Sequence, residues 1–404
     1  MSKIVIVWEM GADLGHVTRL DAVAKCLAKR GHSVTCVFRD LDEIQRSYGS
    51  IQAPPYKVLQ GPRWPIRYSK LSRPPANLVE VLLSIGYHKQ ELLVTRIAEW
   101  RSIFANLDPD LAIFDYAPTA LLATRDKSCN KISLDDPFSK APDIFPLPSF
   151  DPDAKVSTAN LTISETKFLQ IVNQAISKFE LSPITQASDI FATHKSFLLS
   201  IPELDPFAHL RNSSIYLGPI DNNSNKSKKA LNWDEKSRTP KVFAYLKPDY
   251  ASLNIFLAAI SQLNIQGRFF IPGADQEILS RYRNTKIEIS TSPYDLSKDM
   301  ELCDLVVCHG GQSTLTKSVL NGIPALVIPL QQEQLSTTHA CVANGLGLGL
   351  GHGVVDIDKI RAVIHTLLSN ADFQDNAKRC AAHYQTRFTQ PALEVVVKHV
   401  DSCS

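Results

Sequence analysis

Long apolar runs are missing from this 404-residue sequence. No segment reaches the roughly 20 consecutive apolar residues that a membrane-spanning helix needs. Near the start of the chain only about four apolar residues stand together before polar sequence follows, which is too short for a secretory signal. We therefore expect a cytoplasmic protein without a transmembrane segment, which could touch a membrane only by its surface.

The sequence also lacks a large charge of one sign and any short paired spacing of cysteines. Its formal net charge is +2, so nothing indicates a nucleic-acid partner. The eight cysteines are scattered, and three of them (Cys36, Cys303 and Cys308) lie in or beside apolar runs, as small core residues of a reducing compartment do. Neither a zinc site nor a disulfide framework is indicated, and the length fits two domains of about 200 residues.

The most informative part of the chain is the segment 303–334. Its apolar residues 305–307 predict a buried parallel strand, and a helical pattern begins after the turn that follows. This turn reads His309-Gly310-Gly311-Gln312-Ser313-Thr314. Glycines let a ligand approach the backbone, the first amides of a helix are unpaired and partly positive, and the two hydroxyls add donors. The order of strand, glycine turn and helix predicts a phosphate or diphosphate site with His309 at its mouth.

A strand with a glycine turn is also common where only tight packing is needed, and that interpretation stays open for the turn by itself. The next residues favour a ligand site. Residues 322–329 end the helix and predict a second buried strand, after which Glu333 and Gln334 follow. In a doubly wound sheet the ends of adjacent parallel strands open on one crevice. One turn would hold phosphates, and the next would offer an acidic and an amide side chain to sugar hydroxyls.

The first 40 residues predict a strand, a helix and a second strand. Residues 3–7 are a β-rich apolar run, residues 17–30 have helical spacing, and Gly31 is placed to cap that helix. His16 lies at the helix start, where the helix dipole disfavours the protonated ring, so a neutral imidazole would be populated near pH 7. His16 is a candidate general base, although a plain capping or loop histidine fits the same position.

A carboxylate that could orient this histidine lies at residue 115. Residues 111–114 read as a buried strand, which places Asp115 at its C-terminal end, on the same edge as the loop of His16. A well-placed general base contributes about 10²- to 10⁴-fold in rate. Asp at a strand end is also ordinary turn chemistry, so Asp115 could instead only hold its loop.

The segment 303–334 resembles the nucleotide-diphosphate-binding signature of the UDP-glycosyltransferase family with the GT-B fold. In that family a strand precedes His-Gly-Gly, a Ser/Thr pair, Gly-x-Pro and an acidic residue followed by Gln. The resemblance is strongest over residues 290–352, where Pro293 resembles the loop that packs against the nucleobase, and it is fair over residues 1–40. It implies a set of donor-binding residues: His309, Gly310, Gly311, Ser313, Thr314, Glu333, Gln334 and Pro293.

The resemblance also implies roles for His16 and Asp115, because in the family the histidine deprotonates the acceptor and the aspartate pairs with it. The implied enzyme is an inverting, metal-independent glycosyltransferase of the hexosyltransferase type, with no cofactor. Its donor would be a nucleotide diphosphate sugar, with a UDP-sugar expected, and its acceptor a small or lipid-like molecule with a hydroxyl group. The alternatives that stay open are a nucleotide-sugar epimerase on the same scaffold and a non-catalytic nucleotide-sugar-binding subunit, although the presence of both His16 and Asp115 argues against the latter.

Three departures from the family leave the nucleotide, the sugar and the acceptor open. Lys317 stands where many users of UDP-sugars carry a ribose-binding Glu. Thr291 and Ser292 occupy the place of a Trp that stacks on the base in plant members. The sequence Tyr245-Leu246-Lys247-Pro248 stands in place of the usual Gly-Ser turn.

The resemblance predicts an α/β protein of the GT-B type, with two doubly wound, Rossmann-like domains facing each other across a cleft. Residues 221–240 are polar and rich in Asn, Ser and Lys, as linkers are, and residues 241–246 predict the first strand of the second domain. We predict an acceptor-binding domain over residues 1–225 and a nucleotide-sugar-binding domain over residues 226–404. By resemblance the last helix crosses back to the first domain.

Two proline-rich segments interrupt the predicted first domain. Residues 53–76 contain six prolines with Trp64, and residues 137–152 contain five prolines with three phenylalanines. We expect both to be loops whose aromatic and cationic groups could bind an acceptor. Surface packing is an equally good explanation of their composition.

Overall fold

The computed structural model describes ten stretches of the chain: residues 1–11, 14–41, 54–64, 73–151, 153, 155–221, 229–283, 285–296, 300–351 and 356–403. The chain divides into two compact units. Unit 1 comprises Met1–Ile201, Phe207–Asn222 and Gln390–Ser404, and unit 2 comprises Pro202–Pro206 and Asn223–Thr389. The predicted boundary at residues 225 and 226 lies outside the described residues.

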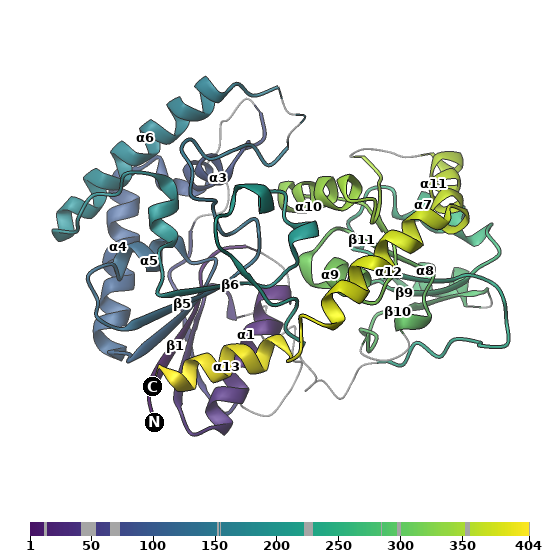
Figure 1. The fold of residues 1–404 in the computed structure, drawn as a ribbon, viewed down its shortest axis with the longest axis horizontal. Coiled ribbons are helices and arrows are strands. Elements are labelled where there is room, and N and C mark those ends of the chain that lie inside the picture. Colours follow the sequence, from purple (N-terminus) through teal and green to yellow (C-terminus); the bar gives the residue numbers. More distant parts are fainter. Residues whose placement is uncertain are drawn as a thin grey trace. The chain divides into compact units, whose positions relative to one another are not determined.

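Unit 1 is built on a seven-stranded parallel sheet with the strand order β3-β2-β1-β4-β5-β6-β7 (Figure 1). Its strands are Lys3–Trp8 (β1), Ser33–Phe38 (β2), Lys57–Gln60 (β3), Leu111–Asp115 (β4), Asn130–Asp135 (β5), Lys195–Leu198 (β6) and Ile215–Tyr216 (β7). Its α-helices are Leu14–Lys29 (α1), Leu78–Leu82 (α3), Gln90–Leu107 (α4), Pro118–Ala123 (α5), Thr158–Ile176 (α6) and Ala392–Ser402 (α13).

The sheet of unit 1 is buried on both faces, as parallel sheets are. Successive side chains of a strand point to opposite faces. Ile4, Ile6 and Trp8 accordingly share a core with α1 and α13, whereas Val5 and Val7 share a second core with α4, α5 and α6. This burial explains why the strands read as continuous apolar runs in the sequence.

The last helix, α13, belongs to unit 1 although it follows unit 2 in the sequence. Val396, Val397 and Val400 of α13 are fully buried in the same core as Leu20 and Leu27 of α1. Figure 1 shows α13, in yellow, beside the purple α1. Apolar packing thus ties the end of the chain to its beginning.

Unit 2 is built on a six-stranded parallel sheet with the order β10-β9-β8-β11-β12-β13. Its strands are Lys241–Tyr245 (β8), Gln266–Phe270 (β9), Ile287–Ser290 (β10), Leu305–Cys308 (β11), Ala325–Val327 (β12) and Gly347–Gly349 (β13). Its α-helices are Leu253–Ser261 (α7), Gln276–Tyr282 (α8), Gln312–Leu320 (α9), Gln332–Ala343 (α10), Ile357–Ser369 (α11) and Ala371–Gln385 (α12). The predicted class of two doubly wound α/β domains is confirmed.

Both sheets have a topological switch point, where the strand order reverses direction. In unit 1 this point lies between β1 and β4, and in unit 2 it lies between β8 and β11. Ligands of doubly wound sheets bind outside the carboxyl ends of the strands at such points. The loop leading to His16 follows β1, Asp115 ends β4, and the turn at His309 follows β11.

The structure differs from the sequence-based expectation at two places in unit 1. The helix expected from residue 17 begins at Leu14, so His16 lies inside its first turn. Residues 57–60, expected as part of a loop, form the edge strand β3, because their backbone pairs with β2 while their side chains stay mostly exposed. Residues 53 and 65–72 of the same proline-rich segment lie outside the described residues.

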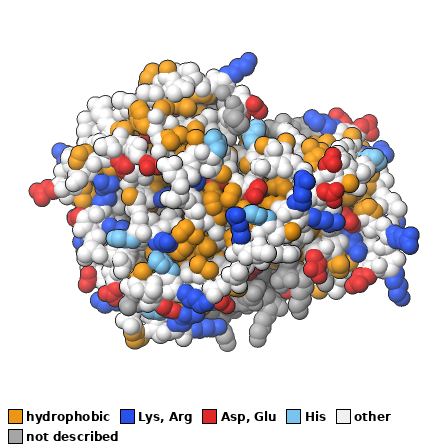
Figure 2. All heavy atoms as spheres, in the orientation of Figure 1, with side chains coloured by type: hydrophobic (Ala, Val, Ile, Leu, Met, Phe, Trp, Pro, Cys, Tyr) orange, Lys and Arg blue, Asp and Glu red, His pale blue; other side chains and the backbone are white. Residues whose placement is uncertain are grey.

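Charges of both signs are interspersed on the face of the molecule that Figure 2 displays, in keeping with the small net charge. No helix in the described part of the chain is long and apolar enough to cross a membrane.

Replacing Val397 by Ala tests how α13 holds to unit 1. The change removes two fully buried methyl groups and should lower the free energy of unfolding by about 2 kcal/mol, which urea denaturation can measure. Lys398→Ala on the exposed side of the same helix is the matched control and should change it by less than about 0.5 kcal/mol. Equal effects of the two changes would contradict the packing of α13 described above.

Candidate functional site

His16 is the third residue of α1 and lies at the switch point of unit 1. Its ring is buried, with 6% of the residue exposed. It stacks on Trp8 of β1 at 5.7 Å between ring centroids and lies 6.5 Å from Tyr116, which follows β4. The two aromatic rings come from neighbouring strand ends and fix the plane of the imidazole.

Asp115 lies beside His16 because of the register between β1 and β4. Trp8, the last residue of β1, is paired with Asp115, the last residue of β4. Nδ1 of His16 lies 2.9 Å from Oδ1 of Asp115, so a ring that carries its proton on Nδ1 donates it to the carboxylate. The structure therefore brings together the two residues that the sequence analysis singled out.

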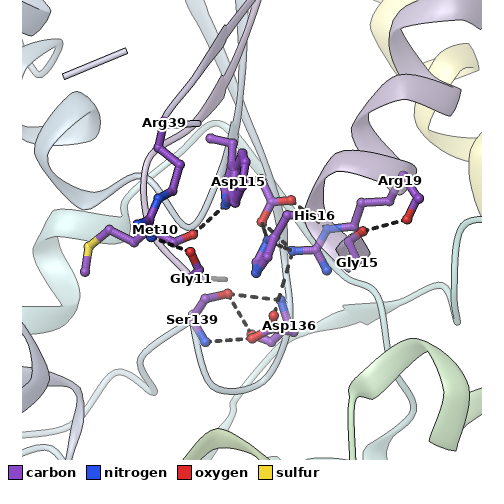
Figure 3. Close-up of polar contacts among 11 residues, drawn as sticks. Met10, Gly11, Gly15, His16, Arg19, Arg39, Asp115, Asp136 and Ser139 are labelled. Carbon is purple, nitrogen blue, oxygen red and sulfur yellow. Dashed lines mark hydrogen bonds and ion pairs between the residues drawn. The ribbon is translucent and has the colours of Figure 1, made fainter. Parts of the chain in front are cut away.

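Arg19 also takes part in this cluster, and the sequence analysis missed it (Figure 3). Its Nε donates to Oδ2 of Asp115 at 2.6 Å, its Nη2 donates to Oδ1 of the same carboxylate, and Nη2 lies 2.9 Å from Nδ1 of His16. Nη2 is also 3.7 Å from Oδ2 of Asp136, which follows β5. Arg19 lies three residues after His16, a spacing that places two side chains on one helix face and could have indicated it.

The charges in this cluster shift the pKa values of its members. Burial by itself raises the pKa of Asp115, but Arg19 and then His16 outweigh burial and lower it to about 2. Burial by itself lowers the pKa of His16, and Arg19 lowers it as well, yet Asp115 prevails and the pKa of His16 lies above its ordinary value. This direction is opposite to the one expected from the helix dipole alone, because the carboxylate is in direct contact with the ring.

The second ring nitrogen of His16 faces the backbone of Gly11. Gly11 has a positive φ of 85°, and a Cβ at this residue would lie 2.6 Å from Nε2 of His16. The guanidinium of Arg39 donates to the carbonyl oxygen of Gly11 and holds this part of the loop. Within the part of the chain that the structure describes, Nε2 has no hydrogen-bond partner, so it is the nitrogen that can serve a ligand.

Glu9 is a second buried carboxylate near this site that the sequence analysis did not single out. It accepts hydrogen bonds from the backbone N–H groups of Thr119 and Ala120 at 2.8 and 3.1 Å, and from Nε1 of Trp64 at 2.9 Å. Burial raises its pKa. Trp64 also stacks on Tyr87 at 5.0 Å. In the described part of the segment 53–76, Trp64 is therefore a packed and hydrogen-bonded residue.

The second proline-rich segment, residues 137–152, is also largely packed. Phe138 and Phe150 are buried and stack at 4.3 Å, whereas Phe145 is 47% exposed. The backbone N–H of Leu147 donates to the buried carboxylate of Glu165 at 2.7 Å. Packing therefore explains the presence of Phe138 and Phe150, whereas Phe145 is exposed.

The glycine turn of unit 2 has the geometry of an open helix N-terminus. Gly311 is the N-cap residue of α9 and makes no side-chain cap, and a Cβ built on it would have nothing within 4 Å. Gly310 has φ +85°, and a Cβ there would meet Cγ1 of Val327 at 2.9 Å. The hydroxyls of Ser313 and Thr314, in the first turn of α9, have no hydrogen-bond partner among the described residues. Gly310 thus shapes the turn, while Gly311 leaves space above the helix.

His309 is held by the backbone on both sides of its ring. Nδ1 lies 2.8 Å from the carbonyl oxygen of Ile328, and Nε2 accepts the N–H of Lys247 at 2.8 Å. These contacts require a neutral ring with its proton on Nδ1. We expected a ring nitrogen of His309 to face a diphosphate, whereas in this conformation both ring nitrogens are hydrogen-bonded to the protein backbone.

The other predicted donor residues lie around the same sheet edge of unit 2. Gln334 is buried, and its Oε1 accepts the N–H of Leu330 at 2.7 Å, which shapes the loop before α10. Glu333 is half-buried in the first turn of α10, and Lys317 is half-buried on α9. Pro293 follows the edge strand β10, two strands away from β8, and its carbonyl accepts the N–H of Lys229 at 2.9 Å.

Comparisons with known proteins point to one group of enzymes. Residues 270–392 match the model of the glycosyltransferase family 28 C-terminal domain. UDP-glycosyltransferase UGT5 of Dactylopius coccus is 25% identical over 101 residues, which are 24% of this chain and 19% of that protein. UDP-glucuronosyltransferase 2A3 of Pongo abelii is 20% identical over 160 residues, 36% of this chain and 28% of that protein. The similarity thus spans less than a third of the length of either relative.

A solved structure shares the fold over nearly the whole chain. The spinosyn rhamnosyltransferase SpnG complexed with thymidine diphosphate superposes with a TM-score of 0.67 at 16% identity, covering 99% of this chain and 100% of that chain. At an identity this low, the superposition is evidence for a shared fold alone.

Asp115→Asn tests the charge cluster of unit 1. It should lower the free energy of unfolding by about 3 to 5 kcal/mol near pH 7, because Arg19 loses its main partner while buried. The pKa of Asp115 is depressed to about 2, so its stabilising contribution is complete above pH 4 and disappears as the pH falls toward 2. In urea denaturation the difference between variant and wild type should therefore shrink over that interval.

Asp126→Asn is the matched control for this experiment, because Asp126 pairs with Arg101 at the surface and should contribute less than about 1 kcal/mol. A difference that stays constant between pH 4 and pH 2 would contradict the lowered pKa of Asp115.

Proposed function

We propose that this chain is a glycosyltransferase of the UDP-glycosyltransferase family and that it transfers a sugar from a nucleotide diphosphate sugar to a hydroxyl group of a small-molecule acceptor. The observation that carries this proposal is the His16–Asp115 pair at the switch point of unit 1. Nδ1 of His16 faces a buried carboxylate, while Nε2 has no partner among the described residues. This arrangement is the one that a general base needs.

In the proposed reaction His16 accepts the proton of the acceptor hydroxyl on Nε2. The acceptor oxygen then forms a bond with the anomeric carbon as the bond between that carbon and the diphosphate oxygen breaks, which inverts the anomeric configuration. Asp115 orients the ring and stabilises the imidazolium that forms, because Nδ1 keeps its hydrogen bond to Oδ1 throughout.

We propose that unit 2 holds the nucleotide diphosphate at the N-terminus of α9. The space above Gly311 lets a phosphate reach the first amides of the helix, whose partial positive charge stabilises the negative charge of the leaving diphosphate. The hydroxyls of Ser313 and Thr314 add two donors, so the proposal needs no divalent ion. Glu333 and Gln334 are the residues proposed to contact the sugar.

His309 has a supporting role in this proposal. Its ring ties the loop after β8 to the end of β12 through the contacts to Lys247 and Ile328. It would keep the turn in shape for the diphosphate without donating to it in the conformation described.

The first test separates the base from the donor site. UDP-, dTDP- and GDP-sugars are screened for thermal stabilisation, since a ligand at 100 times its dissociation constant adds about 2.7 kcal/mol. With the sugar that binds, His16→Ala should lose at least about 10²-fold in transfer while it keeps the stabilisation by donor. His209→Ala, at an exposed histidine of the same unit, serves as the control and should transfer sugar at the wild-type rate. Unchanged turnover of His16→Ala would remove His16 as the base.

The second test uses the two glycines of the turn. Gly311→Ala should fold normally, because its φ is −61° and its Cβ meets nothing, but its methyl group should weaken binding of the nucleoside diphosphate by about tenfold through the loss of one charge-assisted hydrogen bond. Gly310→Ala should instead lower the free energy of unfolding by about 2 kcal/mol, because of its positive φ and the close contact to Val327. Calorimetric titration with UDP and dTDP measures the first effect, and undiminished binding by Gly311→Ala would place the diphosphate elsewhere.

A further inference from the structure

Arg19 lies one helical turn beyond His16 on α1, and 12% of its side chain is exposed. We propose that Arg19 is a positioning residue that fixes Asp115 against Nδ1 of His16 and opposes protonation of the ring, which leaves Nε2 ready to accept a proton. This inference rests on the proposed function, because that function assigns His16 as the base. Arg19 would act through its two neighbours and not by touching the substrate.

Arg19 makes a two-point contact with Asp115. Nε of Arg19 donates to Oδ2 at 2.6 Å and Nη2 donates to Oδ1, so the planar guanidinium lies against both oxygens of the planar carboxylate (Figure 3). Such a fork fixes the plane of the carboxylate as well as its distance. Oδ1, the oxygen that faces Nδ1 of His16, is thereby held in place.

Arg19 also contacts the imidazole ring of His16. Nη2 of Arg19 lies 2.9 Å from Nδ1 of His16, the same distance that separates Nδ1 from Asp115. A guanidinium carries only donors, so it forms no hydrogen bond with Nδ1 when that nitrogen carries the proton given to Asp115, and it acts on the ring through its charge. When the imidazole is protonated on both nitrogens, two cations stand in contact. This contact disfavours the imidazolium relative to the neutral ring.

Other charged groups also lie around His16. The charged groups around the cluster come from the ends of three strands: Arg39 after β2, Asp115 of β4, and Asp135 and Asp136 at the end of β5. Arg39 is directed to the carbonyl of Gly11 and lies 5.9 Å from the ring of Trp8. Without Arg19, the nearest charges to His16 would be the carboxylates of Asp115 and Asp136.

A base in contact with a buried carboxylate therefore needs a cation nearby. A general base works best when its pKa is close to the working pH. Burial lowers the pKa of His16, the carboxylate in contact with the ring raises it, and Arg19 is the charged neighbour that opposes this rise. Arg19 opposes this rise while it keeps Asp115 ionised, so the pair can still orient the ring.

The test compares Arg19→Met, which keeps an unbranched apolar stem and removes the guanidinium with its charge, with Arg19→Lys, which keeps the charge and loses the fork. Histidine proton resonances are followed by NMR over a pH titration, and His16 is assigned from the spectrum of His16→Gln. Arg19→Met should raise the pKa of His16 by about one unit or more, and Arg19→Lys should raise it by less. Arg101→Met, which removes a surface ion pair of the same unit, is the control and should leave it unchanged.

The pH dependence of transfer gives a readout that a purely structural role would not move. The acid limb of kcat/KM for Arg19→Met should shift upward with the pKa, so that transfer near pH 7 falls about tenfold and recovers as the pH rises toward 9. An unshifted pKa of His16, or an equal loss of transfer at every pH, overturns the inference.

Two further arms keep the outcome decisive. If Arg19→Met does not fold, the charge-balanced double variant Arg19→Met/Asp115→Asn replaces it. The pKa of His16 in this double variant should lie above the pKa of His16 in Asp115→Asn alone. An equal or lower pKa overturns the inference. The titrations need no substrate, so they can be read even if the wild type transfers no sugar. That result would count against the proposed function, whereas a wild type that transfers sugar together with an unshifted titration counts against Arg19 alone.

Discussion

The register between β1 and β4 is the constraint on which the site of unit 1 depends. It sets Trp8 opposite Asp115, so that two parallel strands end at the same level and their carboxyl ends open on one crevice. The chain leaves β1, passes Gly11 and begins α1 at Leu14, which brings His16 back over both strand ends. A slip of one residue would exchange the faces of β4 and turn Asp115 away from the histidine.

Unit 2 has the same topology, and the chemistry we propose for it is a different one. The order β10-β9-β8-β11 again reverses at one point, and His309, Gly310 and Gly311 follow β11 before α9 begins. Gly310 allows α10 to approach closely, and Gly311 leaves the first amides of α9 open. The neutral ring of His309 ties the loops after β8 and β12 to this turn. A backbone site of this kind needs few side chains, because amides and a helix dipole provide the positive potential.

Apolar periodicity was sufficient to predict the buried strands and a common sheet edge for His16 and Asp115, whereas the two-domain fold and the pairing of these two residues came from the family resemblance. The sequence was not sufficient for Arg19 or Glu9, whose partners come from β4 and α5 and become neighbours only through the tertiary fold. The direction of the His16 pKa was also missed. The expectation rested on the helix dipole alone, whereas contact with the Asp115 carboxylate raises the pKa of His16. The composition of the proline-rich segments suggested acceptor contacts, yet their aromatic residues Trp64, Phe138 and Phe150 are packed.

The ion pair of Arg19 with Asp115 is difficult to explain by stability alone. Removing two charges from water costs several kcal/mol for each ion, and a well-packed apolar pair of the same volume is often as stable or more stable. Aromatic and apolar side chains already surround the site, so such a pair could have been accommodated. What an apolar pair cannot do is hold an acceptor for Nδ1 of His16 and at the same time oppose the protonation of the ring. The buried charges therefore make physical sense as a means of controlling one imidazole.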